Sequence, residues 1–411
     1  MIEFENYNFV YGGVCAAKGF VAGGAAAGIK PGSKKNDLAV IYSLKPCAAA
    51  AVYTANKVKG APITVTKKNL KNGMAQAVVV NSGNANTCNH DGLEIAEKIC
   101  ELTANELHVA KDDIILASTG VIGQKLSIIP FETHLPALCA SLTEFGSEAA
   151  ALSIMTTDTT KKEVAVKFEI SGKTCHIGGI AKGSGMICPN MATLLCFITT
   201  DVLIDKKMLQ IALNEAARVT FNRVSVDGDT STNDMVSIMA SGAAGNPEII
   251  TDDESYEIFF SGLYAVMVNL AREIARDGEG ATKLIECLAV NAPDEQVAET
   301  IAKAVIRSNL FKAALFAADA NWGRILCAIG YADANFDISR VSVDLISRAG
   351  MIRVCENGSG VEFSEEYAHT ILLEDEITVY INLNSGGDGE AVTWGCDLTY
   401  DYVKINAEYR S

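Results

Sequence analysis

The chain has 411 residues and a formal net charge of −16 at pH 7, and 49% of its residues are hydrophobic and 20% charged. This composition is typical of a globular protein large enough for two or three structural units. An acidic chain without a run of Lys or Arg is a poor nucleic-acid binder, so we expect no nucleic-acid partner.

The N-terminus has no basic region followed by an apolar core, and no apolar run reaches the ~20 residues that a membrane helix needs. We therefore expect a cytoplasmic protein without a membrane partner. The five histidines are far apart and lack ligand spacing, so no metal site is predicted. Twelve cysteines without a Cys-x-x-Cys pair indicate reduced, buried thiols, most of them in apolar surroundings, such as Cys100, Cys196, Cys287 and Cys327.

Hydrophobic periodicity predicts both helices and strands along the chain. Helices are expected at 93–102, 206–219 with Asp205 as N-cap, 255–275 and 294–309, and 149–160 begins with a short helix or strand. A loop is expected at 320–324. Strands are expected at 38–42, 48–53, 77–80, 113–117, 164–170, 174–180, 194–200, 284–290, 341–346, 352–355, 377–383 and 391–403.

The strands come in hairpin clusters with helices between them, and neither a Rossmann nor a P-loop motif is present. The predicted fold class is α+β, with helices layered on mixed sheets.

Two polar turns follow predicted strands. Asn81–Asn86 reads NSGNAN, and Ser118–Gly123 reads STGVIG. Glycines at a strand end let backbone N–H groups approach a ligand, so Thr119 and Gly120 could donate hydrogen bonds to an oxyanion. The alternative is that these residues form ordinary Asx-rich or glycine turns without a role in a site.

The stretch 181–200, AKGSGMICPNMATLLCFITT, places Thr193 where a loop enters a buried strand. A β-branched residue suits that position, and the local pattern by itself favours this structural interpretation. The alternative is that Thr193 attacks the Ala192 carbonyl and becomes an N-terminal nucleophile, whose α-amine serves as the base. The pattern does not choose between the two.

Two acidic segments lie further along the chain. Residues 221–234 crowd Asp227, Asp229 and Asn233 together without EF-hand spacing, which indicates a polar loop near a site. Glu279 lies between two glycines, where it is either a turn residue or a ligand for a cation.

The segment KGSGMICPNMATLLCFITTD closely resembles the signature of the ornithine acetyltransferases, the glutamate N-acetyltransferases also called ArgJ proteins. Further stretches resemble the family in the same order along the chain: NSGNAN, STGVIG, MTTDT, SVDGDTSTND, ARDGEGATK, ANWGRI and the terminal INAEYRS. The resemblance implies the family's ArgJ/DmpA-like fold, which is similar to that of N-terminal-nucleophile hydrolases.

The resemblance also implies self-cleavage between Ala192 and Thr193, giving an α chain of residues 1–192 and a β chain of residues 193–411 in a heterotetramer of two each. Thr119 and Gly120 match the family's oxyanion hole. The positions that match its substrate-binding residues are Thr156, Lys182, Thr193, Glu279, Asn406 and Ser411; Thr157 and Thr159 are alternatives to Thr156.

The implied reaction is ping-pong transfer of an acetyl group from N-acetylornithine to Thr193 and then to glutamate, without a cofactor. Whether acetyl-CoA is a second acetyl donor stays open. The alternatives are an N-terminal-threonine acyltransferase or aminohydrolase acting on another acylated amino acid, and an uncleaved binding protein.

Overall fold

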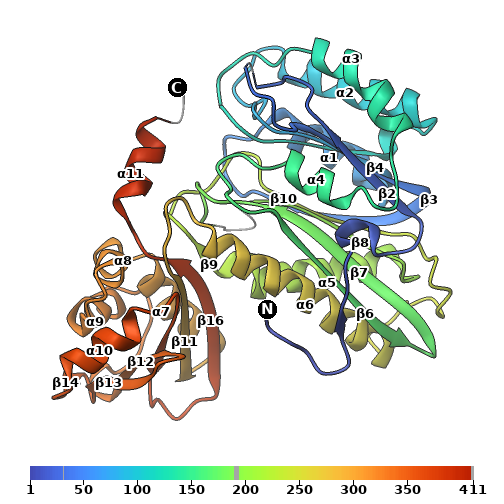
Figure 1. Cartoon of the computed structure of the whole chain (residues 1–411). Coiled ribbons are helices and arrows are strands. Elements are labelled where there is room, and N and C mark those ends of the chain that lie inside the picture. Colours follow the sequence, from blue (N-terminus) through green and yellow to red (C-terminus); the bar gives the residue numbers. More distant parts are fainter. Residues whose placement is uncertain (31, 189–193, 409–411) are drawn as a thin grey trace. The chain divides into compact units, whose positions relative to one another are not determined.

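The computed structural model describes residues 1–30, 32–188 and 194–408. Contacts divide the chain into two compact units (Figure 1). Unit 1 comprises the described residues within Met1–Gly183, Pro189–Asn222 and Thr230–Leu270, and unit 2 comprises Ser184–Cys188, Arg223–Asp229 and the described residues from Ala271 onward.

Unit 1 is built on one mixed sheet whose strands run in the order β1-β6-β7-β8-β10-β3-β4-β5, with β2 paired to β3. The hairpin β6–β7 and the parallel pair β8–β10 lie on one side of β3, and β4 and β5 lie on the other. The strands are β1 (Asn8–Phe9), β2 (Phe20–Ala25), β3 (Leu38–Tyr53), β4 (Met74–Asn81), β5 (Ile114–Ser118), β6 (Lys162–Ile170), β7 (Lys173–Lys182), β8 (Leu195–Thr200) and β10 (Met235–Ala240).

Helices cover both faces of this sheet (Figure 1). Val79 of β4 packs with the helices α2 and α3, whereas Val78 and Val80 pack on the opposite face with α4. The central strands are therefore apolar along their whole length instead of alternating. The helices are α1 (Ala61–Asn69), α2 (Gly92–Leu107), α3 (Ile129–Ala140), α4 (Ser147–Ser153), α5 (Lys206–Val219) and α6 (Glu254–Arg276), whose last residues belong to unit 2.

Unit 2 has a second mixed sheet with the strand order β14-β13-β12-β15-β11-β16-β9, and one face packs against α7, α8, α9 and α10 (Figure 1). Its strands are β9 (Val224–Ser225), β11 (Leu284–Ala292), β12 (Ser342–Ser347), β13 (Gly350–Glu356), β14 (Ser359–Gly360), β15 (Glu376–Asn382) and β16 (Gly389–Cys396). Its helices are α7 (Glu295–Ile306), α8 (Asn309–Phe316), α9 (Trp322–Gly330), α10 (Glu365–Leu372) and α11 (Tyr400–Ala407).

The α+β class is confirmed, and so are most of the predicted elements. The helix at 206–219 begins after Asp205, whose side chain accepts a hydrogen bond from the Lys207 backbone N–H. One described helix, α6, is long and apolar enough to span a membrane, but 67% of its apolar window is buried within the protein. That burial agrees with the predicted core helix at 255–275.

Four local predictions are wrong. The strands expected at 38–42 and 48–53 are one strand, β3, because a bulge between Tyr42 and Cys47 absorbs the polar interruption. The strand expected at 391–403 ends at Cys396, and α11 follows. Asn321 is not in a simple loop but caps α9 through the Arg324 backbone N–H. Cys327 is exposed, unlike the buried Cys100, Cys196 and Cys287.

Candidate active site

Three predicted site residues, Ala192, Thr193 and Ser411, lie outside the described residues. The nearest described neighbour of Thr193 is Leu194, which is buried and directly precedes β8. The Leu194 carbonyl accepts a hydrogen bond of 2.9 Å from the Met235 backbone N–H at the start of β10. Leu194 therefore stands at the start of a strand that lies between β7 and β10 in the unit 1 sheet.

Thr119 and Gly120 follow the last residue of β5. Gly120 has φ +130°, and a Cβ there would lie 2.3 Å from the Gly83 carbonyl carbon and 2.5 Å from the Asn84 nitrogen. Only glycine fits such a position. Within the described part of the chain, neither the Thr119 hydroxyl nor the Gly120 N–H has a hydrogen-bond partner, so two donors remain available to a bound oxygen.

The NSGNAN turn braces this pair of donors. The Asn81 carbonyl accepts the Thr119 N–H at 2.9 Å, and its side-chain oxygen accepts the Ser118 hydroxyl at 2.6 Å. Asn233 adds a second clamp, because its side-chain nitrogen donates to the carbonyls of Ala85 and Ser118 at 2.6 and 2.9 Å. The asparagines therefore hold the turn in place, as the Asx-turn interpretation expected, and they do so beside the predicted oxyanion donors.

Thr156 and Lys182 are brought together by a residue that the sequence analysis did not single out, Asp158. Its side chain is fully buried, and one carboxylate oxygen accepts from Lys162 Nζ and the Gly183 N–H, each at 2.7 Å. The other oxygen accepts the Thr156 N–H at 3.1 Å and lies 4.0 Å from Lys182 Nζ. A single carboxylate thus organises the two predicted substrate-binding positions of unit 1 that lie within the described residues.

The electrostatics of this group suit an anionic ligand. Burial by itself would raise the pKa of Asp158, but the ammonium groups of Lys182 and Lys162 outweigh burial and hold that pKa below its ordinary value. The carboxylate therefore stays ionised between two cations. Because three side chains carry one net positive charge and Lys182 Nζ is only loosely held, Lys182 can turn toward a substrate carboxylate.

Glu279 and Asn406 meet within unit 2. Asn406 Nδ2 donates to Glu279 Oε2 at 2.7 Å, although the two residues lie 127 positions apart. The Glu279 side chain is buried, and none of the described Lys or Arg residues forms an ion pair with it. A Cβ on Gly185 would lie 2.3 Å from the Glu279 carboxylate, so a larger residue there would displace that side chain. A buried carboxylate without a cation favours a cationic ligand.

Asp227, from the predicted polar loop, holds the segment that leads toward Thr193. Its carboxylate accepts the backbone N–H groups of Met186 and Ile187 at 2.6 and 2.9 Å, and the Tyr402 hydroxyl lies 3.4 Å away. Burial and the carboxylates of Asp227 and Glu279 raise the pKa of Tyr402. This part of unit 2 is therefore negative, which agrees with the interpretation of Glu279 as a cation ligand.

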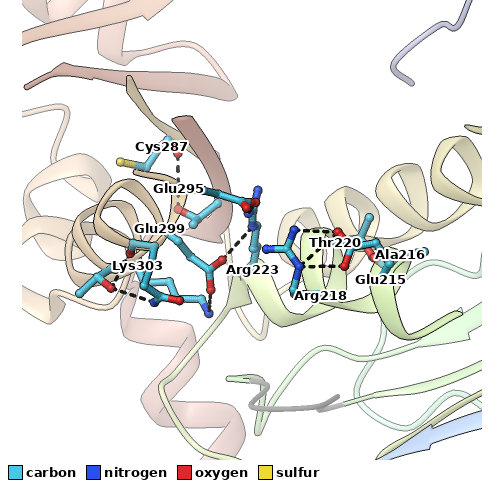
Figure 2. Close-up of polar contacts among 12 residues, drawn as sticks. Glu215, Ala216, Arg218, Thr220, Arg223, Cys287, Glu295, Glu299 and Lys303 are labelled. Carbon is cyan, nitrogen blue, oxygen red and sulfur yellow. Dashed lines mark hydrogen bonds and ion pairs between the residues drawn. The ribbon is translucent and has the colours of Figure 1, made fainter. Parts of the chain in front are cut away.

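Arg223 anchors the beginning of the same loop (Figure 2). Its guanidinium group, only 6% exposed, pairs with Glu295 at 2.5 Å and Glu299 at 3.3 Å on α7, and Lys303 pairs with Glu299. Val224 then enters β9 beside Trp394 of β16. The ion-pair group thus fixes the strand from which Asp227 extends.

Asp234 is a second residue that the sequence analysis missed. It is buried, its Oδ2 has no hydrogen-bond partner among the described residues, and burial raises its pKa well above the ordinary value. It directly precedes Met235, whose N–H bonds to Leu194. No pattern in a single sequence distinguishes this aspartate from the exposed acids of the same loop.

A profile of the ArgJ family matches residues 21–411. The protein named arginine biosynthesis bifunctional protein ArgJ from Symbiobacterium thermophilum is 49% identical over 402 residues, covering 97% of this chain and 99% of that one. The protein of the same name from Gloeobacter violaceus is 47% identical over 414 residues and covers both chains completely.

Two solved structures of similar proteins each cover about half of this chain. The arginine biosynthesis bifunctional protein argJ of Bacillus halodurans gives a TM-score of 0.49 at 45% identity, over 51% of this chain and 97% of that one. The ornithine acetyltransferase of Mycobacterium tuberculosis, complexed with ornithine, gives 0.42 at 34% identity, over 45% of this chain and 100% of that one.

Proposed function

Since the chain belongs to the ArgJ family, we propose that it is a self-cleaving acetyltransferase of arginine biosynthesis that transfers acetyl from N2-acetylornithine to glutamate. The observation that carries this proposal is the turn after β5, where the Thr119 hydroxyl and the Gly120 N–H are unpartnered among the described residues. Donors held in place before the reaction stabilise an oxyanion without reorganisation.

The first step is the maturation of the chain. The Thr193 hydroxyl attacks the Ala192 carbonyl carbon, the peptide C–N bond breaks and an ester forms, and water then releases residues 1–192. The new α-amine of Thr193 has a reference pKa of about 7.7–8.0, so part of it is neutral at pH 7. A neutral amine beside the hydroxyl can then act as its base.

The second step is acetyl transfer. Thr193 Oγ1 attacks the acetyl carbonyl of N-acetylornithine, and the oxyanion accepts hydrogen bonds from Thr119 and Gly120. One such donor typically contributes about 3–4 kcal/mol to the lowering of the barrier. Ornithine leaves with the proton on its amine, and the glutamate amine then attacks the acetyl-threonine ester to give N-acetylglutamate.

Substrate recognition divides between the charged groups. Lys182, held loosely by Asp158, pairs with the substrate α-carboxylate. Thr156 lies beside it, because its backbone N–H donates to the same Asp158 carboxylate. Glu279 with Asn406 takes the side-chain ammonium of ornithine. Ser411 completes the predicted set, where its hydroxyl offers one more hydrogen bond.

Relatives of the chain carry the word bifunctional in their names, which supports a second activity, the acetylation of glutamate from acetyl-CoA. We further propose that the α and β chains assemble as a heterotetramer of two each in the cytoplasm. The alternative, an aminohydrolase, would release acetate from N-acetylornithine at the same rate with and without glutamate.

The experiment that tests the proposed function is the intact mass of the purified protein beside a Thr193→Ala variant. We expect two fragments in the parent, one ending at Ala192 and one beginning at Thr193, and a single uncut chain in the variant. One species of 43.6 kDa in both samples would refute the nucleophile assignment.

A further inference from the structure

A concave site in unit 1 contains none of the residues assigned above. It has a volume of about 510 Å³ and lies against β3 between Ala49 and Tyr53. The strand β4 pairs with β3 only as far as Ala48, so this edge of β3 is not covered by a strand. The walls are the last turn of α1 with the following 3-10 helix Leu70–Asn72, and the first turn of α5. Volumes of this size are typical of small-molecule sites.

Four lysines surround this depression, which we call the lysine pocket: Lys67, Lys71, Lys206 and Lys207. None of them forms an ion pair with a carboxylate in the described ranges of the chain, although the sequence contains 50 acidic residues. Lys206 Nζ donates to the Asn72 carbonyl at 2.8 Å, and Lys67 Nζ lies 4.8 Å from the centre of the Tyr53 ring. Four cations without counter-charges in an acidic protein favour a ligand with several negative charges.

Lys67 lies in surroundings that disfavour its positive charge. Burial and the neighbouring ammonium of Lys59 lower the pKa of Lys67. A bound anion would oppose the repulsion from Lys59, because it supplies an opposite charge beside the ammonium.

The edge of β3 that no strand covers is matched by a side-chain amide. Gln210 of α5 lies along it, with its side-chain oxygen 3.4 Å from the Ala51 N–H and its side-chain nitrogen 3.3 Å from the Ala51 carbonyl. Alternate residues of a strand present their backbone groups to the same edge, so Ala49 and Tyr53 face the same side as Ala51. The Ala49 N–H already donates to the Gly73 carbonyl at 2.9 Å, which leaves the backbone beside Tyr53 for a ligand. A ligand with amides along an extended arm can use the same edge.

Strand register relates this edge of β3 to the start of β8. Tyr53 pairs with Met235, and Met235 pairs with Leu195, which follows Thr193 by two residues. Two strand spacings amount to about 10 Å, so the Tyr53 end of the pocket and the start of β8 lie at the same end of the sheet.

We propose that the lysine pocket binds the phosphate-bearing nucleotide end of acetyl-CoA, with the pantetheine arm directed along the edge of β3 toward Tyr53. This inference rests on the proposed use of acetyl-CoA as a second donor. The thioester C–S bond breaks as the acetyl carbon bonds to Thr193 Oγ1, and the hydroxyl proton passes through the Thr193 amine to the leaving sulfur. The products are acetyl-threonine and free CoA, and glutamate then accepts the acetyl group.

The test compares the mature protein with a Lys71→Ala/Lys207→Ala variant, and with a Lys34→Ala/Lys35→Ala control that removes two exposed lysines elsewhere. Calorimetric titration with CoA should give a dissociation constant at least about tenfold weaker in the pocket variant, as expected for lost charge-assisted hydrogen bonds. The KM for acetyl-CoA in glutamate acetylation should rise by a similar factor. The KM for N-acetylornithine should stay unchanged in all three proteins.

Three results would overturn the inference: no CoA binding by the parent protein, equal CoA binding by the pocket variant, or binding of inorganic pyrophosphate as tight as that of CoA. The last would identify a general anion site. Acetyl transfer from N-acetylornithine to glutamate is measured in the same preparations. Because that reaction needs no CoA, it tests the proposed function separately from the lysine pocket.

Discussion

At the scale of single residues, the buried carboxylate of Asp158 contacts two predicted substrate-binding residues, Thr156 and Lys182. Thr156 and Lys182 each contact it, and Lys162 neutralises it from the other side. Removing one partner of a buried ion pair leaves the other charge buried without compensation. The resulting loss of folding stability is larger than the net stabilisation that the intact pair provides. Asp158 therefore has a role in stability as well as in positioning.

We expect Asp158→Asn to lower the free energy of unfolding by about 3–5 kcal/mol at neutral pH. The pKa of Asp158 is lower in the folded protein than the ordinary ~3.9, so its stabilisation is present above that value and is lost as the pH falls below it. Denaturant unfolding at pH 7 and below pH 4 measures the difference, which should shrink in acid. Asp112→Asn, at an exposed site, serves as the control; a pH-independent difference would contradict the prediction.

Glu279→Gln keeps the hydrogen bond from Asn406 but removes the negative charge. If the carboxylate holds the ornithine ammonium, the KM for N-acetylornithine should rise about tenfold, as for one lost hydrogen bond to a charged group. Steady-state kinetics with Glu366→Gln, an exposed residue of α10, as the control provide the measurement. An unchanged KM would remove Glu279 from the site.

At the scale of elements, the turn after β5 depends on a close approach of two backbone segments. Gly120 packs against Gly83 and Asn84, whereas Gly123, in the same turn, has φ +75° and no atom within 4 Å of a built Cβ. A side chain at Gly120 would meet both steric overlap and backbone strain, whereas a side chain at Gly123 would meet backbone strain alone.

Gly120→Ala should destabilise the protein by about 3 kcal/mol or more, because strain and overlap combine. Gly123→Ala should cost only about 1–2 kcal/mol, since strain acts alone. Thermal unfolding of both variants, monitored by circular dichroism, tests this order. Equal losses would mean that the Gly83 segment moves away freely.

At the scale of the whole molecule, the proposed cut would divide the unit 1 sheet between two chains. β7 and β3 precede Ala192, whereas β8 and β10 follow Thr193, yet β7 pairs with β8 and β3 with β10 along six residue pairs each. The ladder hydrogen bonds and the apolar face under them hold the strands together without the covalent link.

The two fragments should therefore migrate as one species in native size-exclusion chromatography and separate only in denaturant. Mass spectrometry of the native peak identifies both. Fragments that separate in native buffer would show that the sheet does not survive cleavage.

Much of this protein is determined by local sequence. The β6–β7 hairpin, the Asp205 cap of α5 and the buried α6 follow from periodicity and capping, which depend on neighbouring residues. Strand and turn patterns also predict that Thr119 and Gly120 follow a strand and that Glu279 lies in a turn between a helix and a strand.

Only the tertiary structure decided the rest. The alternating residues at 399–403 resemble a strand, but Asp397 binds the Thr282 and Lys283 N–H groups and ends β16, after which α11 begins. The pairs Glu279–Asn406 and Lys206–Asn72 join residues more than a hundred positions apart. Such contacts depend on strand order and on which faces pack, and these arise from burial of the whole chain, which no local pattern encodes.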